Sequence, residues 1–328
     1  MTETHKIIPN LKETLHITPN PDGTFTRPVD IYPIVPPSID DLDSPSLSKD
    51  VTLNSEKSTW VRVFLPRLFL SSLSSSSPRK KHPIIVYVHG SGFVVASVAH
   101  PNFHDFCSYA ASQLAALVVS VEYRLAPEHR LPAAYDDVLE ALTWVKEGKD
   151  EWIQEYGDLS SCVMMGDSAG GNIVYHTGLM AAARVDELKP LQIKGLVLIQ
   201  PYFSGLVRTE SELRLENDKI LNLKCNDLCW EASLPIGADR SHEYCDSVKD
   251  GGSSLLDRVR ELGWRVWVVS CDGDPLFDRS VELVKLMEKR GLDVKSKFRE
   301  GGEHGMFVGS PSKYKADELL NFVKGFFS

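Results

Sequence analysis

A serine flanked by small residues follows a short apolar run in the middle of the chain. The motif GDSAGG, from Gly166 to Gly171, comes after the strand-like run CVMM and before a stretch with helical spacing of apolar residues. Small residues permit the tight strand-to-helix turn that exposes a nucleophilic serine, and the helix start points backbone N–H groups at it. A glycine-rich turn that binds nothing or binds a phosphate has the same pattern, so Ser168 is a candidate nucleophile that requires partners.

An acid and a histidine follow two later strand-like runs. The run RVWVVS is followed by CDGDPLFDR, and the run VKSKF is followed by REGGEHGMF. Parallel strands would bring Ser168, Asp274 and His304 to one edge of a sheet, in the chain order of nucleophile, acid and base that hydrolases with such a serine turn use. The competing acids are Asp272 and Asp278, and the competing histidines are His100, His104, His129, His176 and His242.

A second glycine-rich turn lies upstream. HGSGF, from His89 to Phe93, follows the apolar run PIIVYV. Small residues there expose consecutive backbone N–H groups, which would stabilise the negative charge that develops on a carbonyl oxygen under attack. The alternative interpretation is that the glycines only turn the chain and that His89 only bonds backbone atoms.

Strand-like and helical stretches alternate along most of the chain. This alternation predicts the α/β fold class, with a mostly parallel central sheet and helices on both faces. Strands are expected at 60–65, 84–88, 116–121, 162–165, 196–200, 266–270 and 294–298, and helices at 101–114, 132–146, 169–183, 280–290 and 312–327.

Two regions interrupt the alternation. Residues 1–48 are rich in turn signals and indicate an irregular arm, and residues 204–258 contain Pro and Gly breakers and little strand character. We expect the arm and this insertion to form a cap over the carboxyl edge of the sheet. The α/β core would then consist of residues 49–203 and 259–328.

Two loops are expected to have structural roles. The serine-rich tract at 71–78 is typical of a solvated loop. The loop YRLAPEHRLP is rich in charge, and we expect Arg124, Glu128 and Asp136 to tie it to the sheet.

Several motifs occur together in one order. HGSGF, SVEYRLAPEHRLPAAYDD, GDSAGGN, DGDPLFD and EHG resemble, over nearly the whole chain, the plant carboxylesterases of the hormone-sensitive-lipase-like branch of the α/β hydrolases. The resemblance implies an α/β-hydrolase fold with a helical cap and a mechanism without a cofactor. In it Ser168 is the nucleophile, His304 the general base and Asp274 its orienting acid. The implied oxyanion donors are the N–H groups of Ser91, Gly92 and Ala169.

One position departs from the family's pattern. The family usually has HGGGF, and this chain has Ser91 at the middle glycine. Relatives with altered motifs include a gibberellin receptor, an isoflavanone dehydratase and alkaloid cyclases, so a non-hydrolytic lyase or cyclase and a small-molecule receptor are the alternatives. His304 disfavours the receptor, and Ser168 disfavours the dehydratase, which has threonine there. We therefore expect a serine carboxylesterase that hydrolyses short-acyl esters of small or specialised metabolites.

The substrate pocket has weaker signals. Large apolar side chains in and near the cap could line it, or could form the cap's own core. The candidates are Phe93, Phe203, Leu206, Trp230 and Met306.

Composition limits the partners and the compartment. The net charge is −9 and no basic block is present, so nucleic acid is not an expected partner. No apolar run is long enough to span a membrane or to resemble a secretion signal, which favours the cytoplasm. Six scattered cysteines fit a reducing compartment, and Cys225 and Cys229 are interpreted as ordinary thiols because no second pair of metal ligands lies near them. We expect a small ester as the partner, and no metal or cofactor.

Overall fold

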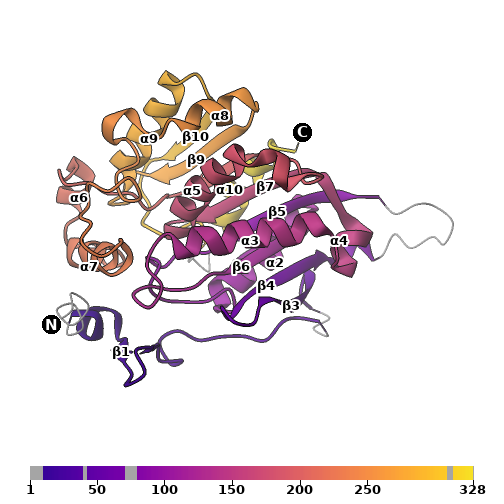
Figure 1. The fold of residues 1–328 in the computed structure, drawn as a ribbon, viewed down its shortest axis with the longest axis horizontal. Coiled ribbons are helices and arrows are strands. Elements are labelled where there is room, and N and C mark those ends of the chain that lie inside the picture. The colour runs from indigo at the N-terminus through magenta and orange to yellow at the C-terminus, as the bar shows by residue number, and fades with distance from the viewer. Residues whose placement is uncertain (1–9, 40–42, 71–79, 309–312, 328) are drawn as a thin grey trace.

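The central element is an eight-stranded sheet with the strand order β10-β9-β8-β7-β5-β6-β4-β3 (Figure 1). The computed structural model describes residues 10–39, 43–70, 80–308 and 313–327. Strands β5 to β10 pair in parallel, and β4 pairs antiparallel with β6 and with β3. The α/β fold class and the mostly parallel sheet are therefore confirmed. The strands are β3 (Ser46–Asn54), β4 (Thr59–Pro66), β5 (His82–Val88), β6 (Leu117–Glu122), β7 (Gly157–Asp167), β8 (Ile193–Ile199), β9 (Arg265–Cys271) and β10 (Asp293–Arg299).

Both faces of the sheet are covered by helices. Along β5, Ile84 and Val86 belong to one hydrophobic cluster and Ile85 and Tyr87 to the other, because successive side chains of a strand point to opposite faces. This double burial explains why β5 is an unbroken apolar run. One cluster includes residues of α3 (Ala133–Glu147), α5 (Ala169–Ala183), α8 (Leu255–Glu261) and α9 (Phe277–Lys289), and the other includes residues of α2 (Pro101–Leu114) and α10 (Lys313–Lys324).

The helix starts and ends follow local chemistry. Helix α2 begins with Pro101, which lacks a backbone N–H. This is tolerated because N–H groups in the first turn of a helix have no partner within the helix. The side chain of His100 accepts a hydrogen bond from the backbone N–H of Asn102. It ends at Ala115, which has a left-handed backbone. The predicted bounds of α2 and α5 agree with the structure. The shorter elements are β1 (Thr18–Pro19), β2 (Phe25–Thr26), α4 (Glu151–Tyr156), α6 (Glu210–Arg214), α7 (Leu223–Ser233), η1 (Arg67–Phe69), η2 (Val185–Leu188) and η3 (Lys249–Gly251).

Strand β3 was not predicted, because its sequence SLSKDVTLN is largely polar. The polar residues have specific partners: Ser46 Oγ bonds Ser108 Oγ, and Asp50 forms an ion pair with Arg62. The strand begins at Ser46, so the sheet starts slightly before the expected boundary at 49. The serine-rich tract at 71–78 lies outside the described residues.

The N-terminal arm lies next to the insertion after β8 (Figure 1). Its residues 10–15 are helical, and Glu13 forms an ion pair with Lys224 of α7 at 3.1 Å. The Tyr32 hydroxyl donates to the carbonyl oxygen of Leu15 at 2.7 Å, which ties two parts of the arm together. Within the insertion, the described structure is helical or irregular, as the lack of strand character predicted.

Arg27 attaches the arm to the core. Its guanidinium donates to both carboxylate oxygens of Glu128, at 2.9 and 2.8 Å, and to the carbonyl oxygens of Val94 and Ala126. Glu128 belongs to the loop YRLAPEHRLP, whose structural role is thereby explained. Arg124 in the same loop pairs with Asp137 of α3 at 2.7 Å, so the aspartate that holds this loop is Asp137, next to the expected Asp136.

Candidate active site

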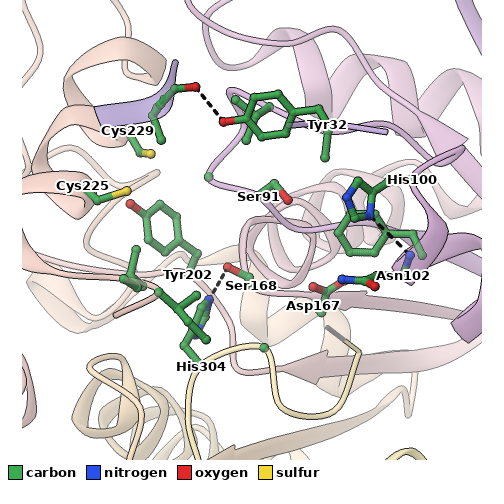
Figure 2. Close-up of a pocket in the computed structure, with 18 of the residues that line it drawn as sticks. Tyr32, Ser91, His100, Asn102, Asp167, Ser168, Tyr202, Cys225, Cys229 and His304 are labelled. Carbon is green, nitrogen blue, oxygen red and sulfur yellow. Dashed lines mark hydrogen bonds between the residues drawn. The ribbon is translucent and has the colours of Figure 1, made fainter. Parts of the chain in front are cut away.

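Three side chains from different strand ends form one hydrogen-bonded chain, of which Figure 2 shows the contact between Ser168 and His304. The Oγ of Ser168, directly after β7, lies 2.8 Å from Nε2 of His304, and Nδ1 of His304 lies 2.9 Å from Oδ2 of Asp274. Asp274 follows β9 and His304 follows β10, so the parallel sheet brings all three to its carboxyl edge. Asp274 is fully buried, and the other two are each 7% exposed. The arrangement can deprotonate the serine hydroxyl through the imidazole.

The backbone at Ser168 is strained in the way that a nucleophile turn requires. Its φ is +52° and its ψ is −120°, outside the regions that a serine normally adopts. A Cβ added to Gly166 would lie 2.4 Å from the carbonyl oxygen of Gly170, and one added to Gly170 would lie 2.0 Å from that of Val88. Only glycine therefore fits on either side of this turn.

The protonation of His304 depends on two opposing effects. Burial by itself lowers the pKa of His304, but the carboxylate of Asp274, together with those of Asp167 and Asp218, raises it, and the net pKa is above the ordinary value. In the neutral ring, Nδ1–H donates to Asp274 and the lone pair of Nε2 accepts from Ser168. The buried carboxylate thus selects the tautomer that a general base needs.

Gln200 bridges Asp274 and the loop that carries His304, and its contacts were not predicted from the sequence. Its Nε2 donates to Oδ2 of Asp274 at 2.6 Å and to the carbonyl oxygen of Glu303 at 3.1 Å, and its Oε1 accepts the N–H of Gly305 at 3.0 Å. Gln200 is buried and has a φ of +44°. It follows β8, between the strands that carry Ser168 and Asp274, and its position directly after a buried strand was the one available signal.

The competing acids and histidines lie elsewhere. Asp272 accepts the N–H of Gly301, and Asp278 accepts the N–H of Ser211 in the insertion, so the structure brings neither to His304. Of the five competing histidines, only His100 lines the cavity that contains Ser168.

The HGSG loop after β5 lies against Ser168. A Cβ on Gly90 would come within 3.0 Å of Cβ of Ser168, and both Ser91 and Gly92 line the same cavity. Ser91 and Gly92 have φ values of +79° and +64°. Ala169 is the first residue of α5, where backbone N–H groups have no partner within the helix. Backbone donors from both turns thus border the space next to Ser168.

Asp167 connects these two turns. The hydroxyl of Tyr87 donates to its Oδ1, and its carboxylate accepts the N–H of Gly90. A Cβ on Gly90 would lie 2.6 Å from Oδ2 of Asp167, which shows how closely the two backbones approach. Burial raises the pKa of Asp167 to about 6, although the hydrogen bond from Tyr87 opposes this rise. Asp167 lies within the motif GDSAGG, but nothing in the sequence pattern indicated this role.

A cavity of about 320 Å³ opens onto Ser168 and His304 (Figure 2). It lies at the carboxyl end of β5, which pairs with β6 on one side and with β7 on the other. The strand order changes direction at β5, and parallel sheets commonly bind ligands at such a switch point. Its wall is mainly apolar. The arm contributes Leu15, Ile31 and Tyr32, and the insertion contributes Ile220, Leu221, Cys225 and Cys229.

Comparison with known proteins places this chain in a family. The family model described as the α/β hydrolase fold matches residues 85–308. Carboxylesterase 20 of Arabidopsis thaliana is 45% identical over 313 residues, which cover 95% of this chain and 94% of that protein. The chain belongs to the plant carboxylesterase family of the α/β hydrolases. Within this family, a 3-O-acetylpapaveroxine carboxylesterase of Papaver somniferum is 44% identical and covers 85% of this chain and 89% of its own length.

Solved structures agree with the family at the level of the fold. An esterase from Pyrobaculum calidifontis has a TM-score of 0.69 and 27% identity, covering 85% of this chain and 83% of its own. The carboxylesterase EstE1, cloned from a metagenomic library, has a TM-score of 0.70 and 24% identity, covering 89% of each chain. The resemblance to plant carboxylesterases that the motifs indicated is confirmed.

The five side chains expected to line the substrate pocket of this carboxylesterase do not line the cavity at Ser168, which corrects that expectation. Phe93 and Trp230 pack behind Tyr202, whose ring stacks on Trp230 with centroids 4.9 Å apart and which itself lines the cavity. Large apolar rings gain more by burial against one another than at a solvated wall. The other three are Phe203, which packs on Tyr175, Leu206, which is exposed, and Met306, which is buried in the hydrophobic cluster that includes residues of α2 and α10.

Neither a membrane-spanning helix nor a metal-binding cluster occurs among the described residues. None of their helices combines the length and the apolar character that crossing a bilayer demands. Nor do three or more of their His, Cys, Asp and Glu side chains gather in a way that could hold a metal ion.

Proposed function

We propose that this protein is a serine carboxylesterase that hydrolyses short-acyl esters of small or specialised metabolites through an acyl-enzyme. The observation that carries the proposal is the hydrogen-bonded chain Ser168–His304–Asp274 at the wall of the cavity. The names of the relatives supply the reaction class, carboxylic ester hydrolysis. No specific observation favours the lyase, cyclase or receptor alternatives.

The first half-reaction forms the acyl-enzyme. Ser168 Oγ attacks the ester carbonyl carbon while Nε2 of His304 takes its proton, and Asp274 stabilises the resulting imidazolium. The carbonyl oxygen becomes an oxyanion, which the N–H groups of Ser91, Gly92 and Ala169 stabilise. Collapse of the tetrahedral intermediate breaks the bond to the alcohol, which leaves with the proton from His304.

The second half-reaction returns the free enzyme. A water molecule gives a proton to Nε2 of His304 and attacks the acyl carbon, and the same three N–H groups stabilise the second oxyanion. Ser168 then leaves with the proton, and the carboxylic acid is released. The neutral state of His304 at the start of each half-reaction is therefore required for turnover.

The cavity supports the substrate class. A volume of about 320 Å³ lies near the lower end of the range for small-molecule sites, and its wall is mainly apolar. The Papaver somniferum relative is named for an acetyl ester of a larger alcohol, which fits a short acyl group and a bulkier leaving group. We propose that the substrate of this protein likewise combines a short acyl group with a bulkier alcohol.

The cap is part of this proposal. Residues 1–48 and 204–258 would cover the site, over a core of residues 49–203 and 259–328. The residues that both segments contribute to the cavity wall support it, as does the ion pair between Glu13 and Lys224. A cytoplasmic location is likewise proposed, supported by six cysteines that are all unpaired.

The test is burst kinetics with p-nitrophenyl acetate. The wild type should release a stoichiometric burst of p-nitrophenol followed by turnover, and Ser168→Ala should lose turnover by roughly 10³-fold or more. Ser270→Ala is the matched control, because Ser270 is also buried and its hydroxyl has no hydrogen-bond partner among the described residues. Retention of most activity by Ser168→Ala would refute the assignment of the nucleophile.

A further inference from the structure

Helix α7 presents two thiols to the cavity that contains Ser168. Cys225 and Cys229 are four residues apart, so they share one face of the helix, and both line the cavity wall. Figure 2 shows the two sulfur atoms on the same side of the cavity as Tyr202. The proposed hydrolysis uses neither thiol.

Cys225 is the more reactive of the two. It lies in the first turn of α7, where its backbone N–H donates to Oδ1 of Asn222 at 2.9 Å and the positive end of the helix dipole favours an anion. A hydrogen bond from the Cys229 thiol lowers the pKa of Cys225, and this effect outweighs burial, which raises it. Of the six cysteines, Cys225 alone is not buried, so a small oxidant can reach it from the cavity.

Cys229 is the complementary partner. The hydrogen bond to Cys225 and burial raise the pKa of Cys229 well above its ordinary value, so its S–H remains protonated. Its sulfur also packs against the HGSG loop: a Cβ added to Gly92 would lie only 2.7 Å from Sγ of Cys229. The position of this sulfur therefore affects the backbone that carries a proposed oxyanion donor.

We propose that Cys225 and Cys229 form a peroxide-sensitive thiol pair that closes into a disulfide and lowers the esterase activity. The Cys225 thiolate attacks a peroxide oxygen, the O–O bond breaks, and a sulfenic acid and hydroxide form, the hydroxide taking up a proton as water. Cys229 sulfur then attacks the Cys225 sulfur, an S–S bond forms, and a second water leaves with the Cys229 proton. Overall the peroxide is reduced by two electrons and the two thiols are oxidised.

The helix geometry permits the bridge. Residues four apart in an α-helix have Cα atoms about 6 Å apart, within the range found in disulfides. Their Cβ atoms are somewhat farther apart than in a relaxed disulfide, so α7 must adjust locally as the bond forms. This adjustment draws the Cys229 sulfur toward Cys225 and away from Gly92.

The chemical step is tested by peptide mass. Trypsin cleaves after Lys224 and Arg240, so both cysteines lie on the single peptide 225–240, separate from Cys245. After hydrogen peroxide and blocking of free thiols, this peptide should lack two hydrogens and carry no blocking group, and dithiothreitol should reverse the change. The Ser168→Ala variant should form the same bridge, so this readout is independent of the proposed hydrolysis.

The functional step is tested by activity. Peroxide should lower p-nitrophenyl acetate hydrolysis by about tenfold, less than the loss of a whole oxyanion donor, and dithiothreitol should restore it. Cys225→Ala and Cys229→Ala, each compared with its own untreated rate, should not respond, whereas the buried-cysteine control Cys107→Ala should respond like the wild type. The proposal is overturned if Cys225 becomes a sulfinic acid without a bridge, if no modification occurs, or if the bridge forms and the rate is unchanged.

Discussion

Gln200 and His304 share one acceptor, the Oδ2 atom of Asp274. The N–H of Gln200 reaches this oxygen at 2.6 Å and Nδ1 of His304 reaches it at 2.9 Å. Because Gln200 also bonds the backbone of Glu303 and Gly305, it holds the residues on both sides of His304. The orientation of Asp274 and the position of His304 thus depend on one amide side chain.

Gln200→Ala should therefore impair the chemical step more than substrate binding. We expect kcat for p-nitrophenyl acetate to fall by roughly 10- to 100-fold with KM little changed, because a misplaced base loses alignment in the transition state. The control is Gln192→Ala, which removes an exposed amide on the surface. A rise in KM with unchanged kcat would contradict the role of Gln200 in positioning.

If Asp274 orients His304, the three variants Asp274→Asn, Asp272→Asn and Asp278→Asn should differ in activity. Asp274→Asn should lower kcat by roughly 10³- to 10⁴-fold, because the amide favours the wrong tautomer of His304 and no longer stabilises the imidazolium. Asp272→Asn and Asp278→Asn should retain most activity, since their carboxylates bond the backbone of Gly301 and Ser211. Steady-state kinetics of the three variants decides the matter, and an equal loss at Asp278 would transfer the role to that residue.

Ser91→Gly should stabilise the protein. The φ of Ser91 is +79°, a conformation that costs a serine about 1 to 2 kcal/mol and a glycine little, although glycine also gains freedom in the unfolded chain. We expect a higher Tm and a change in p-nitrophenyl acetate hydrolysis of less than about tenfold, or about 1.4 kcal/mol in the barrier.

Ser58→Gly is the matched control for that variant. Ser58 is exposed, lies in the turn between β3 and β4, and has a φ of +55°. It should give a similar thermal shift and no kinetic change. If Ser91→Gly instead raised simple ester hydrolysis far beyond tenfold while the physiological reaction declined, the lyase or cyclase alternative would gain support.

The pH dependence should reflect the environment of His304. Because the carboxylates around it raise the pKa of His304, the acid limb of kcat/KM should lie above the pH at which an ordinary histidine titrates. Activity should fall as the pH drops through that value, since a protonated Nε2 cannot accept from Ser168. Asp167 is one of the carboxylates that raise this pKa, so Asp167→Asn should move the limb to lower pH. An unchanged limb would show that Asp167 does not influence the base.

The ion pair between Arg27 and Glu128 allows the contribution of the arm to catalysis to be tested. Arg27→Met should release the arm and lower kcat/KM for bulky esters by roughly tenfold, with a smaller effect on p-nitrophenyl acetate, because a covering segment mainly positions large substrates. Arg258→Met, which removes an exposed ion pair with Glu261, is the control. If Arg27→Met lowered kcat/KM equally for all substrates, the arm would have no specific role in positioning large substrates.

Local patterns predicted the parts of this molecule that depend on local chemistry. Gly166 and Gly170 signal the turn at Ser168 because only glycine fits there, and the apolar strands report burial on both faces. The parts that depend on distant segments were not visible. Gln200 acquires its contacts with Asp274 and Glu303 only when the ends of β8, β9 and β10 come together. Phe93 packs in an aromatic cluster with Trp230. Strand β3 could not be recognised because its sequence is largely polar, and Ser46 bonds a residue that is distant in the sequence, Ser108.

The cavity has two kinds of wall. Ser168 and His304 are held by ends of core strands, whereas Leu15, Tyr32, Ile220 and Leu221 belong to the arm and the insertion. Substitutions in these two segments can change which alcohol is recognised without moving the atoms that break the ester bond. After gene duplication, divergence of substrate preference would therefore accumulate in the arm and the insertion, while the strand ends stay the same.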